Sequence, residues 1–208
     1  MNIKVCGLTD IKQIRQLDGL SVDFAGLIFV PESPRFAGEK LKSDDLLDAD
    51  FDIRKTGVFK DADYAAITKA IRDFGLDVVQ LHGNESPDLC EKLSARTEVI
   101  KAFAVDASSD IDELIDGYDA VCDYYLFDTK TEAGETGGTG QSFNWDIIAT
   151  AKIEKPFFLS GGIGPADAKK IKAFDHPDFY GIDINSRFET APGVKDMKLI
   201  LKFLQDLK

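Results

Sequence analysis

Eight short apolar runs recur along the chain, separated by amphipathic stretches rich in charged residues. Each run has the length and composition of a β-strand buried on both faces. Their starts lie roughly 20 to 30 residues apart, enough for one strand, one helix and two short loops, as parallel strands require. The predicted strands are residues 3–5, 24–30, 56–59, 78–81, 99–103, 124–127, 157–159 and 180–184.

The segments between these runs carry helix signals. One apolar helical face ends at Gly75, which suits a left-handed helix stop. Ser86 followed by Pro87 predicts an N-cap with proline at the first helical position. The faintest helix is the second, where Ser43 is expected to cap the short stretch 44–47.

Eight strand–helix units in 208 residues, with no linker-like change of composition, predict an α/β protein with one domain, a single (β/α)8 TIM barrel spanning residues 1–208. The main alternative is an open doubly wound sheet. An open sheet usually has a Gly-rich turn after its first strand, whereas the Gly-rich turns of this chain come late. That order favours the barrel, whose phosphate site commonly lies after strands seven and eight.

Charge and cysteine content narrow the class of partner. The formal net charge of -12 has the wrong sign for binding nucleic acid or an anionic membrane surface. Cys6, Cys90 and Cys122 are too scattered for a disulfide scaffold, and no stretch is apolar enough to span a membrane. We therefore expect a cytoplasmic protein that binds a small molecule, with monomer and oligomer both left open.

Reactive side chains stand at the carboxyl ends of predicted strands, where barrels of this kind carry their chemistry. Cys6 ends the first strand and Asp128 follows the sixth. Alternation places Lys4 on the inward face with Cys6, and an ammonium there would lower the thiol pKa from about 8.5, giving a thiolate base. Asp128 would supply the complementary proton donor. The structural alternatives are a small buried side chain for Cys6 and a helix cap for Asp128.

Two Gly-rich turns are candidate anion sites. Gly161 and Gly162 follow the seventh strand, where exposed N–H groups at a helix start can bind phosphate. Gly138 and Gly140 lie in the longest connection, where a lid is one interpretation. A tight turn and a flexible linker are the respective alternatives.

Three further polar side chains are candidates for substrate binding. Arg35 has a planar fork that suits a carboxylate, although a surface ion pair is an equal alternative. His82 is a candidate pocket donor, and Asp183 a candidate partner for a sugar hydroxyl or a cap for the next turn. The chain has only two histidines, which excludes a metal site built from several of them, so no metal is expected.

These residues fall within motifs that extend over nearly the whole chain. The chain resembles the phosphoribosylanthranilate isomerase family of tryptophan biosynthesis. The resemblance is carried, in order, by KVCGLT at 4–9, GLIF at 26–29, SPR at 33–35, GVF at 57–59, VVQLHG at 78–83, FDTK at 127–130, GGTG at 137–140, FNW at 143–145, SGG at 160–162, GID at 181–183 and PG at 192–193.

The resemblance implies an Amadori rearrangement of N-(5-phosphoribosyl)anthranilate, without metal or organic cofactor. The cysteine that matches Cys6 is the general base, and the aspartate that matches Asp128 is the general acid. Arg35 matches the residue expected to bind the anthranilate carboxylate. The late Gly-rich loops, together with Asn185 and Ser186, match the phosphate site.

Two positions depart from the family pattern. After strand eight the family usually reads Ser-Ser-Gly, whereas this chain has Asn185, Ser186 and Arg187. Gln141 stands where lysine is frequent. The alternatives are another phosphosugar enzyme, for which Lys130 is the candidate Schiff-base lysine, and a catalytically silent binding or regulatory protein on the same scaffold.

Overall fold

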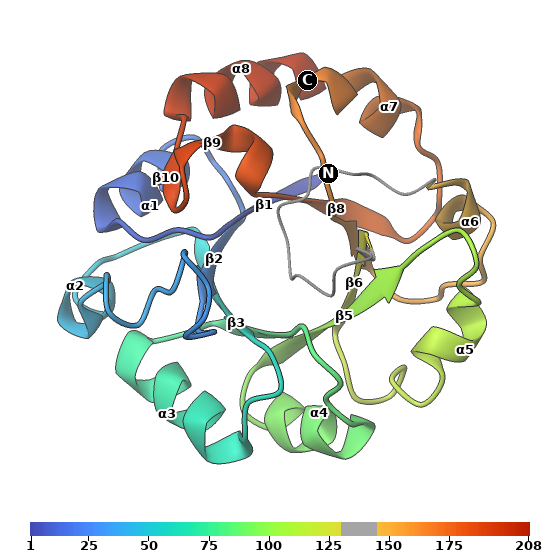
Figure 1. The fold of residues 1–208 in the computed structure, drawn as a ribbon, viewed down its shortest axis with the longest axis horizontal. Helices are drawn as coiled ribbons and strands as arrows, with labels where there is room; N and C mark the ends of the chain where they lie inside the picture. The colour runs from blue at the N-terminus through green and yellow to red at the C-terminus, as the bar shows by residue number, and fades with distance from the viewer. Residues whose placement is uncertain (130–144) are drawn as a thin grey trace.

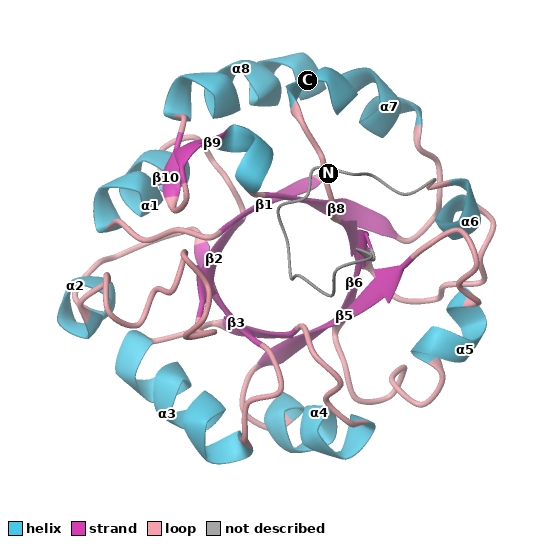
Figure 2. Cartoon of the chain, in the orientation of Figure 1, coloured by secondary structure: helices cyan, strands magenta, loops and turns pink. Residues whose placement is uncertain are grey.

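A computed structural model describes residues 1–129 and 145–208. Lys130, Gly138, Gly140 and Gln141 lie outside the described residues. The remainder forms a ring of strands surrounded by helices (Figures 1 and 2). Strands β1 to β8 are parallel and follow one another around the ring, which closes where β8 pairs with β1. The predicted (β/α)8 barrel is confirmed, and the alternative of an open sheet is wrong.

Seven of the barrel strands extend to or beyond the predicted bounds, whereas β2 ends two residues early. The chain leaves β2 after Ile28, whose carbonyl accepts a hydrogen bond from the Ala37 N–H at 2.8 Å. Strand β6 runs on through Thr129 and so carries Asp128 itself. The strands are β1 Asn2–Cys6, β2 Phe24–Ile28, β3 Arg54–Phe59, β4 Val78–Leu81, β5 Glu98–Val105, β6 Tyr124–Thr129, β7 Phe157–Leu159 and β8 Phe179–Ile184.

The helix signals are confirmed at two of three places. Gly75 ends α3 with φ 59°, and the Ser86 side chain caps α4, which begins at Pro87. The N-cap of α2 is Lys42 rather than Ser43, which is already the first helical residue. The helices are α1 Ile11–Asp18, α2 Ser43–Leu47, α3 Tyr64–Phe74, α4 Pro87–Ser94, α5 Ile111–Ile115, α6 Asp146–Ala149, α7 Ala168–Ala173 and α8 Met197–Leu207.

A small hairpin between β8 and α8 was not predicted. A 3₁₀ turn, η2 Ser186–Phe188, leads into the antiparallel strands β9 Glu189–Ala191 and β10 Val194–Lys195. Phe188 is fully buried, with its ring 4.8 Å from that of Phe203 on α8. This contact joins the turn before the hairpin to α8, and Figure 1 shows β9 and β10 next to α1 and α8.

The opposite end of the barrel is closed by aromatic rings. Phe24 makes edge contacts with Tyr124, Phe158 and Tyr180, and Arg54 covers the Phe24 ring at 5.1 Å. These side chains form an apolar cluster inside the barrel, separate from the larger layer between barrel and helices. The Cys6–Asp128 cavity lies at the other end, towards the carboxyl ends of the strands.

None of the helices within residues 1–129 and 145–208 combines the length and the apolar character needed to cross a bilayer.

Candidate active site

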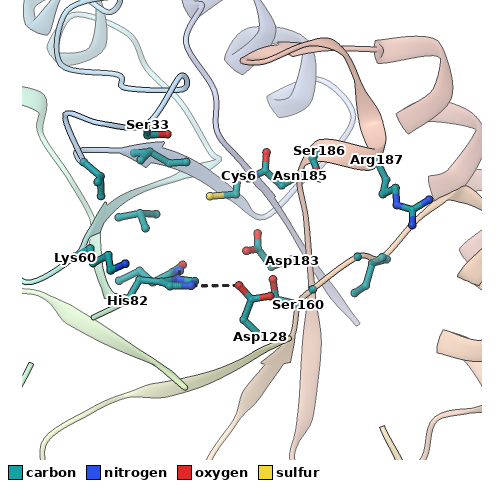
Figure 3. Close-up of a pocket in the computed structure, with 17 residues that line it drawn as sticks. Cys6, Ser33, Lys60, His82, Asp128, Ser160, Asp183, Asn185, Ser186 and Arg187 are labelled. Carbon is teal, nitrogen blue, oxygen red and sulfur yellow. Dashed lines mark hydrogen bonds and ion pairs between the residues drawn. The ribbon is translucent and has the colours of Figure 1, made fainter. Parts of the chain in front are cut away.

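One cavity opens at the carboxyl ends of the strands and collects side chains from both halves of the chain. Most of the polar groups predicted from the sequence reach it, including Cys6 from β1 and Asp128 from β6. Figure 3 shows them around a common space. The labelled lining residues are Cys6, Ser33, Lys60, His82, Asp128, Ser160, Asp183, Asn185, Ser186 and Arg187.

Cys6 lies beside a buried ion pair. Lys4 and Asp183 are joined at 3.0 Å between Nζ and Oδ1, and both side chains are buried. Burial opposes the charge of Lys4, but Asp183 and Cys6 raise the pKa of Lys4, so its ammonium is retained. The predicted inward placement of Lys4 next to Cys6 is thus observed.

The expected direction of the Cys6 pKa shift is wrong. Burial is the largest influence and raises the pKa of the thiol, and the Asp183 charge adds to that rise. Lys4 and Lys195 act in the opposite direction without overcoming burial. The nearby cation is visible in the sequence, but the loss of water around the thiol and the carboxylate that pairs with the cation are not.

Asp128 is held by a chain of hydrogen bonds along the inner wall. His82 Nε2 lies 3.2 Å from Asp128 Oδ2 (Figure 3), and Gln80 Nε2 donates to His82 Nδ1 at 2.7 Å. Because Nδ1 accepts from Gln80, the ring proton lies on Nε2 and faces Asp128. The other carboxylate oxygen, Oδ1, accepts from the Thr129 N–H at 2.9 Å. His82, predicted as a pocket donor, is therefore in direct contact with the predicted acid.

The loops after β7 and β8 lie next to each other at the cavity wall. Gly161 and Gly162 both have positive φ, and they line the cavity together with Asn185 and Ser186. An added Cβ at Gly161 would lie 2.1 Å from Thr129 Oγ1 and 2.5 Å from the Thr129 nitrogen. Only glycine fits this backbone.

Gly161→Ala is expected to raise KM for a phosphorylated substrate at least ~10-fold, because the collision with Thr129 displaces the turn. Gly117→Ala is the matched control: φ is 80° there and 86° at Gly161, yet its added Cβ meets only Pro87 Cγ at 3.6 Å. Both variants should lose about 1–2 kcal/mol of stability from left-handed strain. Equal KM values for the two, measured by steady-state kinetics, would remove Gly161 from the site.

Arg35 is the one predicted substrate-binding residue within the described chain that does not line the cavity. Its guanidinium forms a two-pronged ion pair with Glu189, with Nε 3.0 Å from both carboxylate oxygens and Nη2 2.7 Å from Oε2. The pairing that the sequence offered as the alternative is therefore present, although Glu189 is largely buried rather than on the surface.

Lys60 is a cavity residue that was not predicted, and Gln80 and Ser160, which fall within the motifs at 78–83 and 160–162, were given no role. Lys60 directly follows β3, and the same carboxyl-end rule that selected the other loops would have found it. Gln80 lies inside the short run of β4, where a polar residue in a buried strand was the available signal. Glu189 and Lys195 had no signal, since they depend on the unpredicted hairpin.

Within the described ranges, His, Cys, Asp and Glu side chains nowhere gather in threes as a metal site would require. The chemistry available at the cavity is proton transfer by a thiol and by a carboxyl–imidazole pair, beside a Gly-rich turn. The fold and these groups define a (β/α)8-barrel enzyme.

The family model described as N-(5'phosphoribosyl)anthranilate (PRA) isomerase matches residues 3–206. The chain belongs to this family, whose members are isomerases of tryptophan biosynthesis. An N-(5'-phosphoribosyl)anthranilate isomerase from Parabacteroides distasonis is 39% identical over 209 residues, covering 100% of this chain and 93% of the relative.

Solved structures agree over the full length. The phosphoribosyl anthranilate isomerase of Thermotoga maritima superposes with a TM-score of 0.85 at 28% identity, covering 100% of this chain and 98% of the other. A second isomerase structure, in complex with reduced 1-(o-carboxyphenylamino)-1-deoxyribulose 5-phosphate, has a TM-score of 0.82 at 25% identity, with the same coverage. The resemblance drawn from the motifs is confirmed.

Proposed function

We propose that this enzyme converts N-(5-phosphoribosyl)anthranilate to 1-(2-carboxyphenylamino)-1-deoxyribulose 5-phosphate, with Cys6 as general base and Asp128 as general acid. The observation that carries the assignment is that both side chains line one cavity, although β1 and β6 are not neighbours in the barrel. Two separately placed groups suit a reaction that needs one proton delivered and another removed.

The first step is opening of the furanose ring. Asp128 delivers a proton to the ring oxygen, the bond from that oxygen to C1 breaks, and the nitrogen lone pair forms the C1–N double bond of a protonated Schiff base. The Asp128 carboxyl is protonated before this step, and the His82 ring, 3.2 Å away, orients it. Asp128 regains its proton when the C2 hydroxyl loses one in the final tautomerisation to the ketone.

The second step is removal of the C2 proton. Cys6 takes this proton as a thiolate, and the C–H electron pair forms the C1–C2 double bond of an enolamine while the Schiff base is neutralised. The enolamine then tautomerises to the ketone. No electrons enter or leave, so the product is an isomer of the substrate. The ion pair of Asp183 and Lys4 lies beside the thiol, and we assign Asp183 to orient a sugar hydroxyl.

The two ends of the substrate are anionic and need separate sites. We assign the phosphate to the turn of Gly161 and Gly162 with Asn185 and Ser186, which line the cavity together. Backbone amides of a Gly-rich turn and a hydroxyl are groups that bind phosphate. We assign the anthranilate carboxylate to Arg35. Gly138 and Gly140 remain proposed contributors on the phosphate side.

The test is direct turnover. The purified protein is mixed with freshly prepared N-(5-phosphoribosyl)anthranilate, and the loss of anthranilate-type fluorescence is followed. We expect saturable conversion, together with growth of a tryptophan auxotroph that lacks this step. Saturable binding without any fluorescence loss would contradict the proposal and support a silent binding protein.

A further inference from the structure

A buried carboxylate links Arg35, which lies outside the cavity lining, to a lysine that holds the cavity residue Asn185. Glu189, the first residue of β9, is paired with Arg35 on one side and with Lys195 on the other. Its side chain is 4% exposed, and that of Lys195 is 0% exposed. Burying charged groups costs free energy, which only close pairing and hydrogen bonds between them can offset.

Glu189 leaves one edge of the Arg35 guanidinium available. The carboxylate takes Nε and one hydrogen of Nη2, with the shortest contact 2.7 Å. A guanidinium has five N–H donors in a rigid plane, so Nη1 and the second hydrogen of Nη2 form another fork on the outer side. Glu189 therefore sets the plane in which Arg35 can receive a second carboxylate.

Lys195 extends the network to the loop after β8. Its ammonium donates to Glu189 Oε1 at 2.7 Å and to Asn185 Oδ1 at 2.7 Å. Burial alone would raise the pKa of Glu189, but Arg35 and Lys195 hold it below its usual range, so the carboxylate stays ionised between them. Asn185 lines the cavity next to Ser186, on the side assigned to phosphate.

The two arms of the network meet beside the catalytic thiol. A Cβ added at Gly7, the residue after Cys6, would lie 2.7 Å from both Arg35 Cδ and Asn185 Oδ1. Arg35 and Asn185 thus pack on the bare backbone that follows β1. One buried carboxylate and one buried ammonium fix their positions relative to each other and to Cys6.

We propose that Glu189 and Lys195 are positioning residues that set the specificity for a ligand with two anionic ends, Glu189 by orienting Arg35 and Lys195 by holding Asn185. The inference rests on the proposed function, because it adopts the assignment of Arg35 to the aryl carboxylate and of Asn185 to the phosphate side. Neither Glu189 nor Lys195 lines the cavity, so both act through another residue.

The test compares two ligands by inhibition of turnover. One is the reduced product analogue, which carries carboxylate and phosphate, and the other is the same analogue prepared from aniline, which lacks the carboxylate. In Glu189→Gln we expect the preference for the carboxylated ligand to fall at least ~10-fold, with kcat within ~3-fold. Glu98→Gln, which removes the partner of Arg54 at the closed end of the barrel, is the control and should leave the preference unchanged.

A double-mutant cycle shows whether Glu189 acts through Arg35. Arg35→Met should reduce the preference at least as much as Glu189→Gln, and the double variant should lose no more than Arg35→Met alone. Equal weakening of both ligands in Glu189→Gln, or additive losses in the double variant, would overturn the positioning role. If Arg35→Met itself leaves the preference unchanged, the carboxylate assignment in the proposed function is wrong instead.

Lys195→Met gives an independent readout. Both ligands carry phosphate, so both should bind at least ~5-fold more weakly while the preference between them is kept. Wild-type affinity for both ligands would refute the role of Lys195.

Arg35→Lys covers the case in which Glu189→Gln does not fold, since it leaves the hairpin intact. A lysine cannot form two parallel hydrogen bonds, so the same loss of preference is expected. If Arg35→Met loses the preference and Arg35→Lys keeps it, a point charge is sufficient and the orienting role of Glu189 is refuted.

Discussion

Cys6→Ala is expected to lower kcat/KM for N-(5-phosphoribosyl)anthranilate at least ~100-fold, about 2.7 kcal/mol of transition-state stabilisation. The variant removes the group that takes the C2 proton, while Lys4 and Asp183 can still pair behind it. Affinity for the reduced product analogue should stay within ~3-fold, as measured by titration. This separation of rate from binding is the signature of a group needed mainly in the transition state.

The same assignment fixes a pH dependence. Burial raises the pKa of Cys6 above its ordinary value, so at neutral pH most of the free enzyme carries the thiol and not the thiolate. The base form becomes more abundant as pH increases towards that pKa, and kcat/KM of the wild-type enzyme should increase with it above neutrality. Cys6→Ala should lack this alkaline rise. A Cys6→Ala enzyme with wild-type kcat/KM, or with the same alkaline rise, would exclude Cys6 as the base.

Asp128→Asn is the second variant with a large expected effect, again at least ~100-fold in kcat/KM. Asparagine keeps the shape of the side chain and can still accept from the Thr129 N–H. It has no acidic proton to give to the furanose oxygen, and its amide N–H would compete with the Nε2–H of His82. Ring opening should therefore become slow, while affinity for the open-chain product analogue is retained.

Asp123→Asn is the matched control for this variant. Asp123 precedes the same strand at its opposite end, where the carboxylate accepts from the Val99 N–H at 2.8 Å. Its kcat/KM should stay within ~3-fold of wild type in the same fluorescence assay. A loss of similar size in both variants would indicate that damage to β6, and not the missing acid, accounts for the effect.

Much of the fold could be predicted because it depends on local order. Parallel strands buried on both faces appear as continuous apolar runs, and Gly75 and Ser86 act on backbone groups within a few residues of themselves. The second helix was the hardest to predict, because its five residues are too few to show a helical period. The hairpin of β9 and β10 left no pattern, because strands of three and two residues are too short to show alternation.

The residues of the candidate site also divide into those that the sequence could indicate and those that it could not. Cys6, Asp128, His82 and Asp183 could be selected because strand ends meet at one side of a barrel whatever the details of packing. The partners of these groups could not be selected. Pairing of Arg35 with Glu189 joins positions 154 residues apart, and nothing near either residue indicates the other.

Strand spacing and the order of the motifs were enough to predict the barrel, the end of it that carries the reactive side chains, and the family. The direction of the Cys6 pKa shift, the His82–Asp128 contact and the Arg35–Glu189–Lys195 network became visible with the folded chain. The physical reason is that burial and charge pairing depend on which distant residues exclude water from a group, and that is a property of the packed chain.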